Sequence, residues 1–160
     1  MQWIVYPSLL AVAATIVLGT PVELFGLQLP EPVIPLVLAY AWALIRPSML
    51  APAMVFLLGL FLDLFWGGPL GLWALSLLLV YAVVLACRNL LAGQETRMLF
   101  TVYCLCVALA FVTAYLIVTL DVGTPPSLLA LVGQVAPTLL LFPCADWLIQ
   151  RFDDGDVRFR

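Results

Sequence analysis

The sequence predicts an all-α integral membrane protein: a compact bundle of about six transmembrane helices in a single domain, residues 1–160. Two observations support this fold class. Apolar residues make up 66% of the chain and charged residues only 9%, and the apolar residues form long runs instead of amphipathic stripes. A helix needs roughly 20 mostly apolar residues to cross a hydrocarbon core of about 30 Å, so the chain has room for six or seven spans with short connections.

Six apolar segments are separated by clusters of turn-forming and helix-breaking residues such as Gly19-Thr20-Pro21 and Gly123-Thr124-Pro125-Pro126. We expect spans at about residues 3–18, 33–45, 49–66, 70–87, 98–120 and 127–149, with a short cytoplasmic tail over residues 150–160. Segment 33–45 covers only about 20 Å, so it either crosses the membrane or re-enters on the same side. Six crossing spans are the simpler interpretation. Pro137 and Pro143 predict a kink in the last span.

The charged residues predict an orientation. All the basic residues lie on alternate connections or in the tail: Arg46, Arg88, Arg97, Arg151, Arg158 and Arg160. The opposite connections carry Glu23, Glu31 and Asp121 and no Arg. The positive-inside rule therefore predicts that the Arg-bearing side and both termini face the cytoplasm. Four tryptophans near span ends, Trp3, Trp66, Trp73 and Trp147, are expected to act as interfacial anchors.

Several kinds of chemistry lack the residues they need. The sequence contains no His and no Lys, which removes Ser-His and Cys-His nucleophile pairs, the usual zinc sites and phosphate-loop lysines. A net charge of -3 argues against nucleic acid as a partner. The cysteines, all in apolar runs, are interpreted as small apolar fillers: Cys87, Cys104, Cys106 and Cys144. We therefore expect no enzyme activity, no metal and no cofactor.

The strongest signal joins the third and fourth segments. It reads Gly59-Leu60-Phe61-Leu62-Asp63-Leu64-Phe65-Trp66-Gly67-Gly68-Pro69-Leu70-Gly71. Asp63 is the one carboxylate well inside a span, where a charge costs about 2.5–3.5 kcal/mol near the bilayer centre and therefore needs partners. Gly59, one turn earlier, allows close approach of another helix. Pro69 fits the first turn of the next helix, and the free amides around Leu70 and Gly71 are candidate donors to the carboxylate. Two interpretations stay open: Asp63 pins the hairpin, or it contacts a substrate, a proton or a partner helix.

These residues resemble a known family. Arg46-Pro47 after a short span, then Gly59 to Asp63, then Gly67-Gly68-Pro69-Leu70-Gly71, look like the signature of MreD, the rod shape-determining membrane proteins of bacteria, over roughly residues 40–78. The motif falls by position on Asp63, Gly67, Pro69 and Gly71, with Arg46 as a weaker match. The resemblance implies a non-enzymatic inner-membrane scaffold of the cell-elongation complex, active in peptidoglycan synthesis. It would bind MreC and be linked indirectly to MreB, RodA and the elongation transpeptidase.

Two alternatives remain. The family is similar in size and span number to the substrate-binding subunits of vitamin importers, which makes such a subunit the second hypothesis, with Asp63 and Gln134 as pocket groups. A membrane enzyme that uses Asp63 alone ranks last, because one acid without a base or metal is weak evidence for catalysis. The tail departs from the more basic tails of the family, since it carries Asp153, Asp154 and Asp156 beside its Arg residues.

Overall fold

The structure, a computed structural model, describes residues 2–19, 23–24, 27–28, 31–45, 48–91, 93–122 and 128–152. Within these ranges the chain forms helices joined by short connections, with one small hairpin of two-residue strands. The elements are α1 (Gln2–Leu18), β1 (Glu23–Leu24), β2 (Leu27–Gln28), α2 (Ile34–Ile45), α3 (Leu50–Trp66), α4 (Leu72–Leu91), α5 (Thr96–Val122), α6 (Leu128–Leu140) and α7 (Phe142–Phe152). The prediction of an all-α bundle is confirmed.

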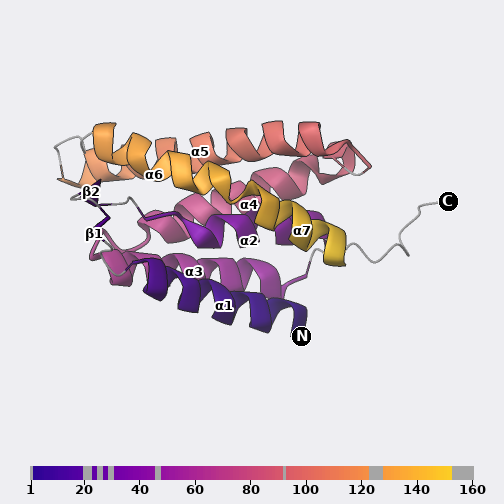
Figure 1. The fold of residues 1–160 in the computed structure, drawn as a ribbon, viewed down its shortest axis with the longest axis horizontal. Helices are drawn as coiled ribbons and strands as arrows, with labels where there is room; N and C mark the ends of the chain where they lie inside the picture. The colour runs from indigo at the N-terminus through magenta and orange to yellow at the C-terminus, as the bar shows by residue number, and fades with distance from the viewer. Residues whose placement is uncertain are drawn as a thin grey trace.

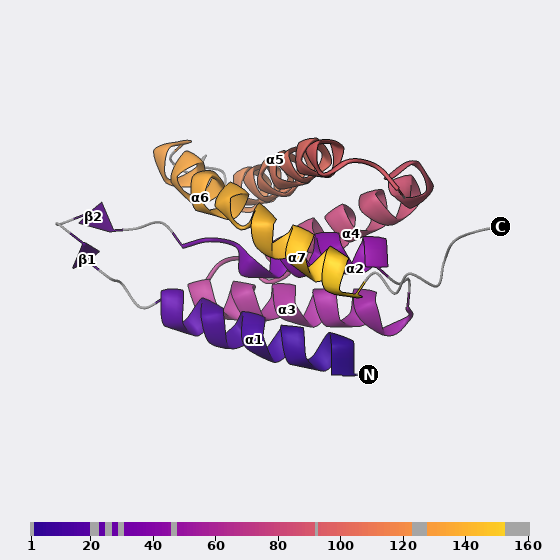
Figure 2. The same cartoon turned by 45° about the vertical axis from the view of Figure 1, so that its right-hand side comes forward.

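From α1 to α6 the helices run in alternate directions, and α7 continues in the direction of α6 (Figure 1). α1 begins and α7 ends at the same end of the bundle, where α2 and α4 also end and α3 and α5 begin. The antiparallel β1–β2 hairpin, which pairs Glu23 with Gln28, projects from the opposite end (Figure 2). That end also holds the turn between α3 and α4. The two ends of the bundle therefore differ in which connections they carry.

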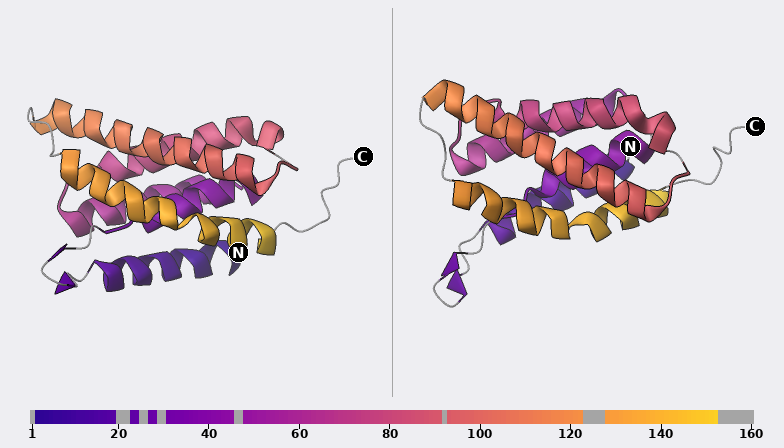
Figure 3. Two further views of the ribbon diagram at one scale, coloured as in Figure 1. Left: turned by 45° about the horizontal axis from the view of Figure 1, so that its top comes forward. Right: turned by 90° about the horizontal axis from the view of Figure 1, so that it is seen from above.

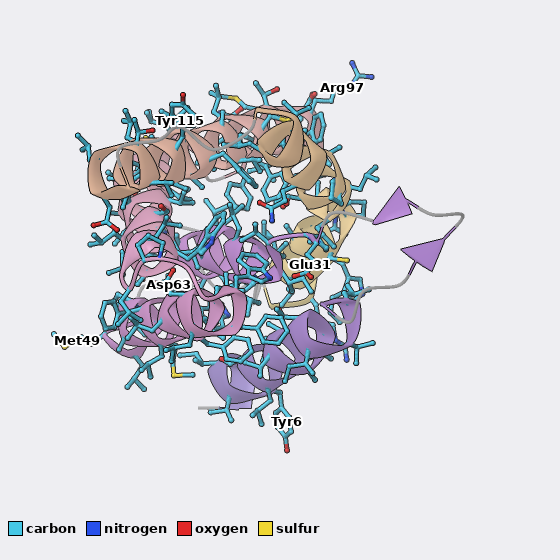
Figure 4. The ribbon with its side chains drawn as sticks, turned by 90° about the vertical axis from the view of Figure 1, so that its left-hand side faces the viewer. Tyr6, Glu31, Met49, Asp63, Arg97 and Tyr115 are labelled. Carbon is cyan, nitrogen blue, oxygen red and sulfur yellow. The ribbon has the colours of Figure 1, made fainter. Side chains whose placement is uncertain are left out.

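α2 is the central helix. It packs against α4, α7, α3 and α1, and Figure 4 shows it surrounded by the other helices. Every residue from Pro35 to Ala43 is buried, including the large side chains of Tyr40 and Trp42. α2 runs antiparallel to α1 and α3, from the end where α1 finishes to the end where α3 starts (Figure 3). The short segment is therefore a single helix in the core of the bundle.

The outside of the bundle is apolar. Leu10, Leu64 and Leu105 are 71%, 71% and 65% exposed, whereas the carboxylate of Asp63 lies inside at 1% exposure. Three helical stretches are long and apolar enough to cross a membrane: Leu72–Leu91, Thr96–Asp121 and Leu131–Arg151. The other apolar helices, Ile4–Leu18, Ile34–Ile45 and Leu50–Trp66, are shorter. An exposed apolar surface this extensive fits lipid better than water.

The observed helices differ from the expected spans at three places. α4 begins at Leu72 and continues to Leu91, so Pro69 lies in the turn before the helix and not in its first turn. The last expected span is two helices, α6 and α7, interrupted at Leu141. α7 continues to Phe152, into residues expected to form the tail.

The interruption at Leu141 has a local cause. Pro143 has no amide hydrogen to donate, and its ring opposes a continuous helix. The Leu141 amide instead bonds the Thr138 carbonyl at 3.2 Å, three residues back, in a tighter turn. Pro137, by contrast, is accommodated inside α6. The expected kink is present, and it falls near Pro143.

Candidate functional site: the α3–α4 hairpin

The side chain of Asp63 caps the helix that follows it. Its Oδ2 accepts the amide of Gly71 at 2.8 Å, and its Oδ1 accepts the amide of Trp73 at 2.8 Å. Both amides belong to the start of α4, where the first amides of a helix have no partner within the helix. The carboxylate of Asp63 thus acts as the N-cap of α4, although Asp63 belongs to α3. The bonds expected between Asp63 and the amides near Gly71 are present, and each carboxylate oxygen accepts one of them.

The main chain of Asp63 also holds the turn. Its carbonyl accepts the amide of Gly67, the C-cap residue of α3, and the amide of Gly68 at 3.1 Å. The second bond is the six-to-one bond of a Schellman motif, and Gly67 has the left-handed φ of 66° that this motif requires. One residue therefore ends α3 through its carbonyl and starts α4 through its carboxylate.

Gly59 is the point of closest approach between α3 and α4. A Cβ atom at this position would lie 2.4 Å from the Cα of Ala74 and 2.6 Å from its nitrogen. No side chain fits there, because both contacts are with backbone atoms that cannot move independently. The close packing expected at Gly59 is therefore present, and it places the buried face of α3 directly on the first turn of α4.

The other motif residues contribute unequally to the turn. Gly71 has a φ of 98°, and its carbonyl accepts the amide of Leu75, the fourth residue of α4, at 2.8 Å. The carbonyl of Pro69 accepts the amide of Leu72 at 3.2 Å. Gly68 has neither a left-handed φ nor any atom within 4 Å of an added Cβ. Gly67 and Gly71 are thus required by the backbone, whereas nothing in the fold requires glycine at position 68.

An acid and two tryptophans extend this site, and their pairing was not predicted from the sequence. Glu31, just before α2, accepts the indole N–H of Trp66 at the end of α3. The Trp66 ring lies edge to face with Trp73 at 5.4 Å between centroids, and Trp73 lies edge to face with Phe111 of α5 at 5.6 Å. Trp73 is only 7% exposed. Its expected role as an interfacial anchor is wrong, because its ring is part of the core.

Figure 4, a view from the hairpin end, shows Asp63 between α3 and α4 and Glu31 toward the interior, whereas Tyr6, Met49, Arg97 and Tyr115 lie at the periphery. Asp63 and Glu31 therefore both face protein. The exposed part of the turn is made of Gly67, Gly68 and Leu70, which is 73% exposed. The turn is thus held by its own residues and by the contacts of Trp66 with Glu31 and of Trp73 with Phe111.

A second polar cluster, also missed from the sequence, surrounds Thr138 beside the helix break. Its hydroxyl donates to the Gln134 carbonyl at 2.7 Å and accepts the amide of Val33 at 3.1 Å. Its carbonyl, next to the break, accepts the hydroxyl of Tyr103 at 2.8 Å. Thr138 is fully buried. These bonds link α6 to the start of α2 and to α5, and only a three-dimensional arrangement could have disclosed them.

Arg46 and Gln134 were also predicted as candidate site residues. Arg46 lies outside the described residues. Gln134 lies on α6, which packs mainly on α5, and its side chain shares no hydrogen bond with Asp63 among the described contacts. Within the described ranges, no three His, Cys, Asp or Glu side chains are grouped closely enough to hold a metal ion. All four cysteines are described, and all are free thiols. The described site offers a braced turn and no unpaired carboxylate oxygen at Asp63.

Comparison of the chain with protein-family models, with curated proteins and with solved structures gave no match.

Proposed function

We propose that this chain is a non-enzymatic scaffold in the bacterial inner membrane, of the MreD kind, which binds MreC and so joins the cell-elongation complex with MreB, RodA and the elongation transpeptidase. One observation carries the proposal. Both side-chain oxygens of Asp63 are used to hold the start of α4. The motif that resembles MreD therefore builds a hairpin in which both carboxylate oxygens of Asp63 hold the turn, which supports a scaffold.

The apolar exterior supports the same proposal. α1, α3, α4 and α5 each expose large apolar side chains along their outer faces, including Leu9, Leu57, Leu79 and Leu116. In lipid, helices associate through close packing of such faces and not through exclusion of water. A protein with a rigid core and several apolar outer faces can hold more than one partner helix at fixed positions.

The charge distribution supports an orientation in that membrane. Arg88, Arg97 and Arg151 lie on the last turn of α4, the first turn of α5 and the last turn of α7, at the end where α1 begins. Glu31 and Asp121 lie at the other end. We propose that the Arg-bearing end, and with it both termini, faces the cytoplasm. The α3–α4 turn and the β1–β2 hairpin would then face outward.

The proposal predicts stable co-purification. Tagged protein, extracted in a mild detergent from a rod-shaped host, is expected to retain MreC, and its depletion is expected to give rounded or widened cells. Purified protein that never retains MreC, from cells that keep normal rod shape on depletion, would contradict the proposal. Bound vitamin in the purified protein together with a vitamin requirement on depletion would instead identify an importer subunit.

A further inference from the structure

The break between α6 and α7 leaves two neighbouring backbone carbonyls without their helical partners. Pro143 has no amide hydrogen, so the Leu139 carbonyl loses the bond that a continuous helix would give it. The amide of Cys144 bonds the Leu141 carbonyl at 3.0 Å and not the Leu140 carbonyl, four residues back. Among the described residues, no side chain donates to the Leu139 or Leu140 carbonyl in their place. Two adjacent acceptors therefore remain open at the break.

These two carbonyls lie on the outside of the bundle. In a helix, each carbonyl points along the axis toward the residue four positions further on. For the Leu139 and Leu140 carbonyls those residues are Pro143 and Cys144, and both are exposed. The open acceptors therefore face the surroundings of the protein and not its core.

The Thr138 carbonyl, one residue earlier, shows how the bundle satisfies a freed group on its inner side. This carbonyl points toward Phe142, which is only 9% exposed. It accepts the hydroxyl of Tyr103, from the neighbouring helix α5, at 2.8 Å. A donor on an adjacent helix is thus the means by which this break is satisfied wherever an adjacent helix is present.

The surface around the open carbonyls is the least covered of the three membrane-length stretches. Only 11% of Leu131–Arg151 is buried within the protein, against 39% of Leu72–Leu91 and 33% of Thr96–Asp121. Its exposed residues repeat at helical spacing and form one surface, the α6–α7 stripe: Val132, Ala136, Leu140, Cys144 and Trp147. Ala136 and Cys144 are small, which allows another helix to approach the backbone beside the break.

The surroundings of the break restrict what can satisfy its carbonyls. They lie near the middle of Leu131–Arg151, at a depth where lipid chains offer no donor and an unpaired backbone group is costly. A purely apolar helix would cover the α6–α7 stripe but leave both acceptors open. A helix with a hydroxyl or carboxamide side chain would cover the stripe and supply the donor, as Tyr103 does from inside.

We propose that the α6–α7 stripe binds a transmembrane helix of another protein, whose hydroxyl or carboxamide side chain donates to the Leu139 and Leu140 carbonyls. A carboxamide has two hydrogens and can serve both. A second copy of this chain fits less well, because its peripheral hydroxyls at Tyr6 and Tyr115 lie within about two turns of a helix end (Figure 4). The proposal does not depend on MreC being the partner, since it concerns a surface and a chemistry.

The test uses the purified full chain in phosphatidylcholine vesicles, with synthetic Leu/Ala transmembrane helices of roughly 20 residues as probes. One probe has a single Asn at its centre, one has the Asn near an end, and one has no Asn. Energy transfer between labelled protein and labelled probe measures binding, at a probe density where the probes alone give no transfer. Wild type is expected to bind the central-Asn probe roughly threefold or more tightly than the other two.

Pro143→Ala restores the amide that the Leu139 carbonyl lacks, and it is expected to abolish the preference for the central-Asn probe. Pro137→Ala, the same change at a half-buried position inside α6, is the matched control and is expected to keep the preference. A preference of the same size in wild type and in folded Pro143→Ala would overturn the proposal. Equal binding of the three probes by wild type would also overturn it, because the carbonyls would then need no donor from another helix.

A second pair of variants keeps the test decisive if Pro143→Ala disturbs folding. Cys144→Trp covers the break from an exposed position, so no core side chain is displaced, and it is expected to reduce binding of the central-Asn probe to the level of the others. Leu105→Trp, at a 65% exposed position on α5, is its control and is expected to bind as wild type does. Energy transfer between two copies of the chain that Cys144→Trp abolishes and the central-Asn probe cannot displace would assign the stripe to a second copy and overturn the proposal.

Discussion

The turn of the α3–α4 hairpin, at one end of the bundle, and the break between α6 and α7 both leave backbone groups without helical partners, but they satisfy those groups differently. In the hairpin, Asp63 accepts hydrogen bonds from amides that lie four to ten residues further along the chain. At the break near Leu141, the carbonyl of Thr138 accepts a hydrogen bond from the hydroxyl of Tyr103, 35 residues away. The hydroxyl of Thr138 accepts one from the amide of Val33, 105 residues away. The hairpin is braced by its own residues, and the break is braced by other helices.

This difference has a consequence for stability in a membrane. Lipid offers no hydrogen bonds, so an interrupted helix there must find partners in the protein. A hairpin that supplies its own partners can form as soon as α3 and α4 meet. The α6–α7 break also has local bonds, such as that from the Leu141 amide to the Thr138 carbonyl, but the bonds of Thr138 with Tyr103 and Val33 form only after α2 and α5 are in place. We therefore expect the hairpin to be the more independent unit and Thr138 to report on assembly of the whole bundle.

The largest effect is expected at the helix contact in the hairpin. Gly59→Val would drive a branched side chain into the backbone at Ala74, and the two helices would have to separate. Overpacking of this kind is expected to lower the free energy of unfolding by about 3 kcal/mol or more. Ala53→Val, on the exposed side of the same helix, is the control. Denaturant titration in detergent measures both, and equal midpoints for the two variants would refute the close contact.

The next effect is expected at Asp63. Asp63→Ala removes both acceptors and leaves the amides of Gly71 and Trp73 without their partners, at a cost of about 2 kcal/mol. Asp63→Asn keeps one carbonyl acceptor and is expected to lose about half as much. The same titration gives both values. A larger loss for Asn than for Ala would mean that the carboxylate is not acting as a cap.

A smaller effect is expected at the helix break. Thr138→Val keeps the shape of the side chain but leaves the buried Val33 amide unpaired, and it is expected to cost about 1.5 kcal/mol. Thr101→Val is the matched control, because the exposed Thr101 hydroxyl bonds only the Arg97 carbonyl of its own helix. The control is expected to stay within about 0.5 kcal/mol of wild type. If both threonines behaved alike, Thr138 would not link the helices.

The smallest effect separates two adjacent glycines of the turn. Gly67→Ala forces a side chain into a left-handed backbone conformation and is expected to cost about 1 kcal/mol. Gly68→Ala is expected to change nothing measurable, since its backbone is unstrained and an added Cβ meets open space. Thermal unfolding of the two variants makes the comparison. Equal destabilisation would show that the left-handed cap does not distinguish them.

Local features of the chain were predictable from sequence and distant ones were not. The close contact at Gly59 and the cap by Asp63 involve residues no more than 15 positions apart in the chain, and the bundle class and approximate helices follow from local apolar runs. The pairing of Glu31 with Trp66, and of Thr138 with Val33, depends on which helices lie side by side. Hydrophobic runs alone do not determine this, because every helix in the bundle is apolar.

The predictions for Pro69 and Trp73 were wrong because each depended on contacts with other parts of the chain. Pro69 is equally acceptable in a turn or in the first turn of a helix, and only the bonds from Asp63 place the start of α4 later, at Leu72. Trp73 lies near a helix end, as an interfacial anchor would, but the approach of Phe111 buries it. Position along a helix does not reveal which neighbour covers a side chain.

The most direct test of the account compares folding with cell shape for the Asp63 variants. Asp63→Asn and Asp63→Ala are expressed in a rod-shaped host depleted of the wild-type protein, and folded protein in the membrane is quantified beside cell width. If Asp63 acts only by bracing the hairpin, rod shape is expected to recover in proportion to the folded protein, including at a lower temperature that favours folding. Round cells with wild-type amounts of folded Asp63→Asn would contradict the account and assign Asp63 a direct contact with a partner.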